Sequence, residues 1–525
     1  MKKLVIIFSA ASMLFLSSCD SWLLEPSPGL TKLEDFYSTG QTAIQNTNAA
    51  YVPLMWEFNY TYFPEWFIGD VVSDDALKGG QNVGDMADVY DLENFKTNSN
   101  NALLLDYYRA QWQGIARCNL PLQEIPKMKT DLILTSSVQN RLVGELKFLR
   151  ALYYFRLVRV FGGVPLVTQV IESAANWKQP RATSAQIYTQ MISDLEDANA
   201  KLWKKSKYPA TDLGRATKGA AQAMLLKVNL YNHNYVDAKR WGDSIMTSNE
   251  YDLIPNYADN FSLAGENGKE SVFEIQFMEN ANSDYGGANG EGGEGYTRGT
   301  FTPILTRSRS KIGGGWGFNK PTQNLFNEFE TIPAVDPRRE ATILNPLDSE
   351  IENATEEIYL GSRYLNRKYA LINTDGSYYK LTHPTRGPIN TKVIRYADVL
   401  LMYAEACCEL NDKVPAKTAL EKVRARARGA ASILPSFPYG AYSDNQSDLT
   451  KAIRHERRVE LAMEGHRWFD LCRWGISNEV MLAYKSTETE AAQGHMAQFI
   501  KGKHELMPIP SKEIDLNPMD QNPMY

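Results

Sequence analysis

The stretch VQNRLVGELKFLRALYYFRLVRV, residues Val138 to Val160, decides the fold class of this chain. Its apolar residues recur at steps of three and four, as in Leu142, Leu146 and Leu149. This spacing places side chains on one face of an α-helix. Gly162 follows the stretch, and glycine readily takes the left-handed conformation that ends a helix. The pattern therefore predicts a long helix with a buried face.

Helical patterns continue on both sides of this stretch. Ser184–Leu202 and Thr217–Tyr231 show the same spacing of apolar residues. Two longer segments, Ala223–Arg240 and Asp398–Leu420, resemble each other, because in each a helix with Leu-Leu leads into a second helix with Ala-Lys. Such pairs look like tetratricopeptide units, which bury their apolar faces by stacking. The repeat is loose, so we predict a mostly helical protein built from helix hairpins, not a regular solenoid.

The middle of the chain, from about 251 to 390, differs in character from its flanks. Ser271–Phe277 alternates Phe and Ile with polar residues, which predicts a short strand with one apolar face. A Gly-rich and aromatic stretch follows, from Tyr285 to Phe318. Long irregular segments in compact domains are usually functional. We therefore expect part of the binding surface here, carried by helix-pair scaffolds at about 32–250 and 391–525.

The N-terminus reads as an export signal. Lys2 and Lys3 precede an apolar run that ends in Leu16-Ser17-Ser18-Cys19, the basic start, short apolar core and small residues of a signal peptide. A cysteine at the cleavage point can carry a diacylglyceryl group, and lipid chains anchor a protein at a membrane surface. We predict a lipoprotein signal peptide over 1–18, lipidation of Cys19 and a polar tether over 19–31.

Composition excludes several classes of function. The net charge of -6 is spread over 56 basic and 62 acidic residues without a long run of one sign, so nucleic acid is not an expected partner. Five cysteines are too few for a disulfide scaffold, and we expect buried thiols at Cys118, Cys407, Cys408 and Cys472. Aromatic residues make up 11% of the chain, which indicates that some rings contact a ligand.

The usual catalytic motifs are missing from the sequence. Gly290–Gly295 matches a nucleotide-binding glycine pattern by letter, but no predicted helix follows it. There is no HExxH, no GxSxG and no calcium-binding loop pattern. Asp74 with Asp75, and Glu460 with Glu464, are the carboxylate pairs that a glycosidase would need, but the second pair lies among arginines in an apparent ion-paired helix stripe. We predict no catalysis, no metal site and no cofactor.

The segment Arg454–Trp474 holds the densest constellation of charged and aromatic residues. Asp448 can cap a helix here. Four charged residues then recur at steps of three and four, which predicts that they share one face: Arg457, Glu460, Glu464 and Arg467. We interpret them as a partly buried charge network, backed by tryptophan rings, that locks the last helix to its neighbours.

Several motifs, in order along the chain, resemble the SusD/RagB family of outer-membrane lipoproteins. They are Cys19–Pro26, Thr31–Tyr37, Asn48–Tyr51, Val393–Ala406, Arg457–Trp474 and Met507–Tyr525. Met524 stands where family members more often carry glycine. The resemblance implies a single domain over 32–525, with tetratricopeptide-like helix pairs and an irregular, loop-rich ligand-binding half that contains short strands.

The resemblance also implies a role. Members of this family capture an oligosaccharide at the cell surface and act as a lid on a SusC-like TonB-dependent transporter. Their ligand surfaces draw on segments that match about Asp70–Phe95 and Tyr285–Phe318 here. Since sugars lie against aromatic rings and hydrogen-bond to polar groups, we expect exposed, clustered rings with polar neighbours. The predicted stacking residues are Trp66, Tyr90, Tyr296 and Trp316, and the predicted hydrogen-bonding residues are Asp75, Lys78, Asn94 and Arg298.

Three other readings of the sequence stay open. RagB-like members of the family bind peptides for import, through backbone hydrogen bonds and shallow pockets. The helix pairs could instead grip a protein, as an interaction scaffold without a small ligand. An enzyme acting on a surface polysaccharide needs only two carboxylates at the right separation, which a sequence does not exclude.

Overall fold

The structure is a computed structural model that describes residues 33–56, 64–279, 299–309, 314–346, 358–373, 375–429 and 433–525. The helices are α2 (Leu33–Phe36), α3 (Gly40–Tyr51), α4 (Ala87–Glu93), α5 (Ala102–Glu124), α6 (Ser136–Phe161), α7 (Ser184–Lys201), α8 (Lys218–Tyr231), α9 (Tyr235–Met246), α10 (Thr302–Thr306), α11 (Gln323–Glu328), α12 (Pro337–Thr342), α14 (Tyr396–Glu409), α15 (Lys413–Arg428), α16 (Gln446–Leu461), α17 (Arg467–Arg473), α18 (Ser477–Thr487), α19 (Thr489–Ala492) and α20 (Ser511–Leu516). The strands are β1 (Ala76–Gly79), β2 (Ser271–Ile275), β3 (Phe318–Pro321), β4 (Ile343–Leu344), β5 (Leu365–Asn366) and β6 (Thr391–Arg395).

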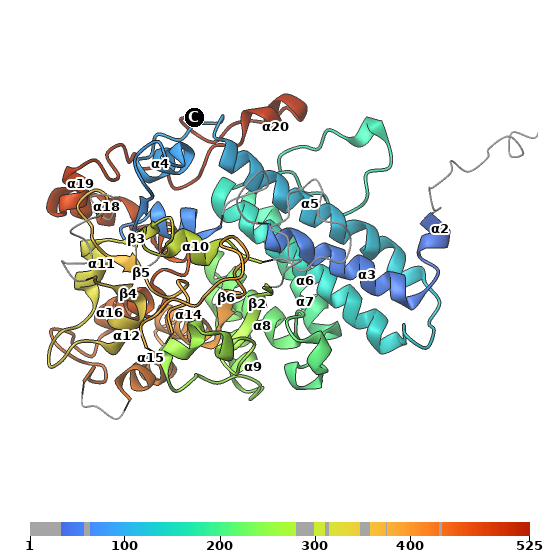
Figure 1. Cartoon of the computed structure of the whole chain (residues 1–525). Helices are drawn as coiled ribbons and strands as arrows, with labels where there is room; N and C mark the ends of the chain where they lie inside the picture. Colours follow the sequence, from blue (N-terminus) through green and yellow to red (C-terminus); the bar gives the residue numbers. More distant parts are fainter. Residues whose placement is uncertain are drawn as a thin grey trace, which may run out of the picture.

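Helix α6 confirms the prediction from Val138–Val160. Thr135 caps its start by accepting a hydrogen bond from the Val138 N–H, and Gly162 ends it with φ +71°. The helix packs against α5 and α7 (Figure 1). From Arg141 onward nearly every residue is buried, because neighbouring helices cover α6 on several sides. The pattern predicted one buried face, and the fold buries almost the whole helix.

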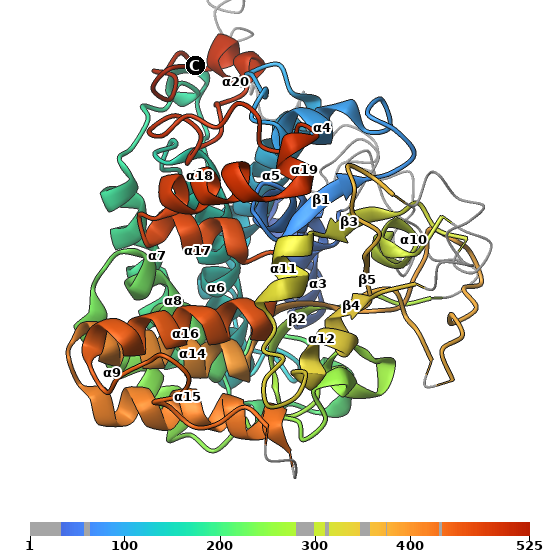
Figure 2. The same cartoon turned by 90° about the vertical axis from the view of Figure 1, so that its left-hand side faces the viewer.

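The two predicted helix hairpins are present as α8–α9 and α14–α15. Asn234 caps α9 by accepting from the Asp237 N–H. Helix α9 packs against α14, which joins the two hairpins into one stack (Figure 2). Most of the molecule is helical and its strands are short, so the predicted fold class is confirmed. Among the described residues, no helix is both long and apolar enough to cross a membrane.

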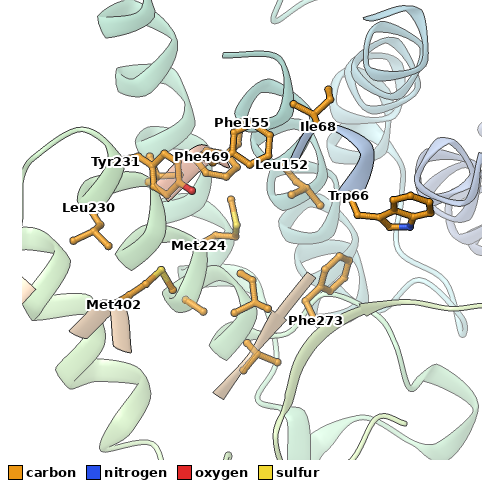
Figure 3. Close-up of a cluster of buried hydrophobic side chains, with 14 of the residues drawn as sticks. Trp66, Ile68, Leu152, Phe155, Met224, Leu230, Tyr231, Phe273, Met402 and Phe469 are labelled. Carbon is orange, nitrogen blue, oxygen red and sulfur yellow. The ribbon is translucent and has the colours of Figure 1, made fainter. Parts of the chain in front are cut away.

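The strands form antiparallel pairs, β1 with β3, β2 with β6 and β4 with β5. The predicted strand over 271–277 is present as β2, and all five of its residues are buried, the polar ones included. Phe273 packs its ring against Phe148 of α6, with 4.9 Å between centroids. Glu274 is also buried and pairs with Lys392 of β6. The rest of the protein therefore covers both faces of this short strand. Figure 3 shows Phe273 among the buried side chains.

The last long helix of the scaffold is shorter than the sequence predicts. Asn445, not Asp448, caps α16, because the Asn445 side chain accepts from the Asp448 N–H. The helix ends at Leu461, and a turn with Met463 at φ +64° and Gly465 at φ +77° separates it from α17. The prediction of one continuous charged face is therefore wrong.

The predicted buried charge network does exist, but its partners come from elsewhere in the chain. Glu460 pairs with Arg338, Arg395 and Arg426, not with a neighbour on its own helix. Glu464, in the turn, lies 2.8 Å from Arg395. These arginines belong to α12, β6 and α15, so the network fastens the irregular region to the helix pairs.

Most of the apolar side chains form one continuous core. Figure 3 shows part of it, where Leu152 and Phe155 of α6 meet Met224 of α8 and Phe469 of α17. The predicted buried thiols are confirmed for Cys118, Cys407 and Cys408, whereas Cys472 is half-buried, and all four are free.

Candidate functional site

The pairing of β1 with β3 brings together the two segments that the family resemblance marked for ligand binding. Leu77 faces Lys320 and Gly79 faces Phe318 across the antiparallel pair. Figure 2 shows β1 beside β3, next to α10. The turn after β1, Gly80–Gly84, is largely exposed. The β1–β3 pair therefore supports a surface that combines residues from near 80 and near 316, which we call the β1–β3 surface.

Glycine is required where the two segments touch. Gly79 has φ +75°, and a Cβ there would lie 2.0 Å from the carbonyl oxygen of Gly317. A real Cβ never comes that close. The Gly80 N–H donates to the Gly317 carbonyl at 2.9 Å. A side chain at position 79 would therefore separate the turn from β3.

Lys78 is the internal support of this turn and is wholly buried. Its ammonium donates to the carbonyl oxygens of Gly79, Asn82 and Asp85 at 2.7, 3.0 and 2.7 Å. Burial lowers the pKa of Lys78 to about 8. The prediction that Lys78 faces a ligand is wrong: with all of these donors used on the backbone, Lys78 shapes the turn from below.

The backbone around Trp316 is hydrogen-bonded to α10 and to the residues after it, and the Trp316 N–H itself donates to the Ile304 carbonyl at 2.8 Å. Gly315 and Gly317 donate to the carbonyls of Ser308 and Arg307 at 2.7 and 2.9 Å. The indole is half-buried, with its ring centroid 6.2 Å from that of Phe301. One part of the ring is thus held by the core while another part reaches solvent, as a stacking platform requires.

Asp85 and Arg309 also belong to this surface, and the sequence analysis missed them. The Asp85 carboxylate accepts from the Gln81 N–H at 2.8 Å and lies 3.6 Å from the Arg309 guanidinium. Arg309 also donates to the Trp316 carbonyl at 3.1 Å. Both side chains remain partly exposed, Asp85 at 33% and Arg309 at 19%. The sequence signal for Asp85 was the pair Gly79-Gly80, because two adjacent glycines indicate a tight turn.

Tyr90 and Asn94 of α4 differ in their exposure. Tyr90 is half-buried, and the ammonium of Lys96 lies 5.4 Å from its ring centroid. Asn94 is buried and donates to the Tyr90 carbonyl at 3.1 Å, which closes the end of α4. The helix terminus thus uses the Asn94 amide nitrogen, and the predicted ligand contact of this buried side chain stays a prediction.

Trp66 and Asp75 are also buried, contrary to the prediction that they face a ligand. Trp66 is 7% exposed, and its ring centroid lies 4.1 Å from that of Phe67. Figure 3 shows Trp66 at the edge of the core. The Asp75 carboxylate lies 2.8 Å from Arg458, a residue far along the chain. Tyr296 and Arg298 lie outside the described residues.

The arrangement suits binding better than bond cleavage. A half-buried indole, a carboxylate and a guanidinium on one surface can stack on a ring and hydrogen-bond to hydroxyl groups. The carboxylates considered for catalysis are buried beside arginines: Arg458 and Arg467 hold the pKa of Asp74 well below its usual range, and Arg395 lowers the pKa of Glu464 to about 2. Within the described ranges, no cluster of His, Cys, Asp or Glu could hold a metal ion.

A cavity of about 710 Å³ lies away from this surface, lined by Tyr257, Phe261, α12 and the end of α15. Three of the basic groups in its wall, Arg338, Lys368 and Arg426, are already paired with buried glutamates. We therefore place the candidate site at the β1–β3 surface and not in this cavity.

Comparisons with known proteins match most of the chain. Residues 269–525 match the model described as the SusD family, and residues 68–230 match the model described as starch-binding associating with outer membrane. SusD-like protein P25 of Formosa agariphila is 27% identical, over 74% of this chain and 72% of that protein. A SusD-like protein of Bacteroides ovatus is 24% identical, over 90% of this chain and 83% of that protein.

Solved structures agree with this fold over nearly the whole length. A laminarin-binding SusD-like protein is 28% identical with a TM-score of 0.74, and the match covers 93% of this chain and 100% of that one. Surface glycan-binding protein A of Bacteroides thetaiotaomicron, solved with laminarihexaose, has a TM-score of 0.75 at 24% identity, over 92% of this chain and 99% of that one. Both of these solved structures are named for carbohydrate binding. The chain belongs to the SusD family.

Proposed function

We propose that this protein is a lipid-anchored binding protein of the outer cell surface that captures oligosaccharides and passes them, uncleaved, to a SusC-like TonB-dependent transporter. Lipidation at Cys19, after removal of residues 1–18, supplies the anchor. The observation that carries the proposal is the β1–β3 surface, where Arg309 lies 3.6 Å from Asp85 and donates to the backbone carbonyl of Trp316, whose indole is half-buried. Tyr90 is a further ligand contact within the proposal.

Capture before import needs affinity without chemistry, and the surface meets that need. An apolar ring face binds the C–H face of a sugar, while a carboxylate and a guanidinium fix its hydroxyl groups through hydrogen bonds. The turn that carries Asp85 is fixed from below by Lys78. Because these groups are held in place before a ligand arrives, little conformational entropy is lost on binding.

Laminarin is the first ligand to test, since a solved relative at 28% identity is named for binding it. Isothermal titration calorimetry with laminarin oligosaccharides, starch oligosaccharides and a peptide mixture separates the candidate ligands. We expect binding to at least one oligosaccharide, and no change in its chain length by chromatography after prolonged incubation. Binding only to peptides would reassign the protein to peptide import, and shortened sugar chains would show an enzyme.

A further inference from the structure

An exposed apolar tip marks the end of the molecule at which the described chain begins. Leu132 is 100% exposed and Ile133 is 47% exposed, in the turn between α5 and α6. Leu33 and Phe36 of α2 are 45% and 39% exposed. Figure 1 shows α2 and the turn after α5 at the same end of the molecule. We define these four side chains as the apolar tip.

Asp131 holds the tip rigidly. Its carboxylate accepts from the N–H groups of Ile133 and Leu134 at 2.7 and 2.6 Å, and from the N–H of Gly40, the first residue of α3, at 2.7 Å. One side chain thus shapes the turn and also fastens it to the segment that follows α2. Leu132 and Ile133 are therefore presented to solvent without the loss of freedom that a mobile loop would pay on binding.

The chain before the tip indicates what covers it. Leu33 follows the proposed lipidated Cys19 by fourteen residues, which span at most about 50 Å when fully extended. A tether of that length confines the body near the bilayer but does not orient it. Protruding apolar side chains beside such an anchor suit insertion into the interfacial region of a bilayer, whereas protein partners usually meet a broader surface.

From these observations we infer that the apolar tip inserts into the bilayer surface and orients the tethered protein. The inference rests on the proposed lipid anchor. Charges in the segment before Leu132 are of both signs, with Lys127 2.8 Å from Glu124 and Lys129 two residues before Asp131, so attachment is apolar and insensitive to salt. In Figure 1, α2 lies at the opposite end of the molecule from α4 and β3, so insertion of the tip fixes which end of the protein lies at the membrane.

Spin labelling of the lipidated full-length protein in phosphatidylcholine vesicles tests this inference. A nitroxide at Leu132→Cys should be accessible to oxygen dissolved in the bilayer and shielded from a water-soluble nickel complex. A label at Val236→Cys, a 65% exposed position on α9, should show the reverse. If the labels at both positions were accessible to the nickel complex and not to oxygen in the bilayer, the inference would be overturned. A label at Leu132→Cys that leaves water only when the transporter is added would also overturn it, in favour of a protein partner.

A second measurement separates the tip from the anchor. In the full chain with Cys19→Ala, the double variant Leu132→Glu, Ile133→Glu should lower partition onto the same vesicles by about tenfold or more, equally in low and high salt. The control Val236→Glu, Val414→Glu changes two other exposed apolar positions and should leave partition unchanged. Equal partition of both variants would overturn the inference. Failure of the protein with intact Cys19 to float with vesicles would instead refute the lipid anchor.

Discussion

At the scale of single residues, a change at Trp316 tests ligand binding with little effect on the packing of the core. We expect Trp316→Ala to weaken oligosaccharide binding by about 1 to 3 kcal/mol, by analogy with bases stacked on aromatic side chains. Its melting temperature should fall only slightly, because the ring is half-buried. Calorimetry and thermal unfolding check both effects. Trp177→Ala, which removes a 69% exposed indole elsewhere, is the matched control. Equal oligosaccharide affinity of the two variants would show that the Trp316 indole does not stack on the sugar.

Asp70 gives a prediction about pH. This carboxyl is buried in the π-helical turn Phe67–Val71, where it accepts from the Gly465 N–H at 2.8 Å and the Asn319 amide at 3.2 Å. Burial raises its pKa from 3.8 to about 8. Between these values the unfolded chain has released a proton that the folded protein keeps, so this group makes the protein less stable as pH rises from about 4 to about 8.

Asp70→Asn removes that titration while keeping the shape of the side chain. The variant should therefore be more stable than the parent at pH 7, by about 1 to 3 kcal/mol, and the difference should vanish near pH 4. Urea unfolding at pH 4, 5.5 and 7 measures it. A difference that stays constant across this range would contradict the assigned pKa.

At the scale of elements, the ion pairs between α17 and the segment before β1 hold distant parts together. Arg467 binds the Asp74 carboxylate through two nitrogens at 2.8 and 2.9 Å. Removing Arg467 leaves the buried Asp74 carboxylate with Arg458 as its one remaining arginine partner among the described residues, at 2.9 Å, so its burial is less well compensated. We expect Arg467→Ala to lower the free energy of unfolding by about 2 to 4 kcal/mol, in urea titration, while the folded protein keeps its ligand affinity.

The control for this prediction is an ion pair of similar length on the surface. Arg109 lies 2.7 Å from Glu513, and its side chain is 45% exposed. Arg109→Ala should lower the free energy of unfolding by less than about 1 kcal/mol, as is usual for exposed pairs. Similar losses in both variants would mean that burial does not set the strength of the α17 contact.

At the scale of the whole molecule, the anchor decides where the protein is found. Cys19→Ala should move it from the membrane fraction to the soluble fraction, because a lipid chain can no longer be attached. Cell fractionation followed by immunoblotting measures the distribution, and calorimetry on the released protein should show unchanged oligosaccharide affinity. A Cys19→Ala variant that stays as firmly membrane-bound as the parent would refute lipidation at this residue.

The sequence by itself determined the elements that depend on local periodicity. Leu142, Leu146 and Leu149 predicted α6, and Gly162 marked its end, because helix formation follows from side chains a few residues apart. The same holds for the two helix hairpins, and the ordered motifs gave the family. The position of the β1–β3 surface along the chain also followed from the resemblance.

Only the tertiary structure decided which polar side chains are buried. Asp75 finds its partner at Arg458, and Lys78 finds backbone carbonyls of a turn that β3 holds in place. We predicted both residues as ligand contacts because they lie in the segment that matches the ligand surface of family members, and a charged residue is normally exposed unless it is paired. Arg458 lies hundreds of residues from Asp75, and β3, which holds the turn around Lys78 in place, is also hundreds of residues away in sequence, so neither leaves a local pattern. The physical reason is that burial depends on long-range packing, whereas helices depend on near neighbours.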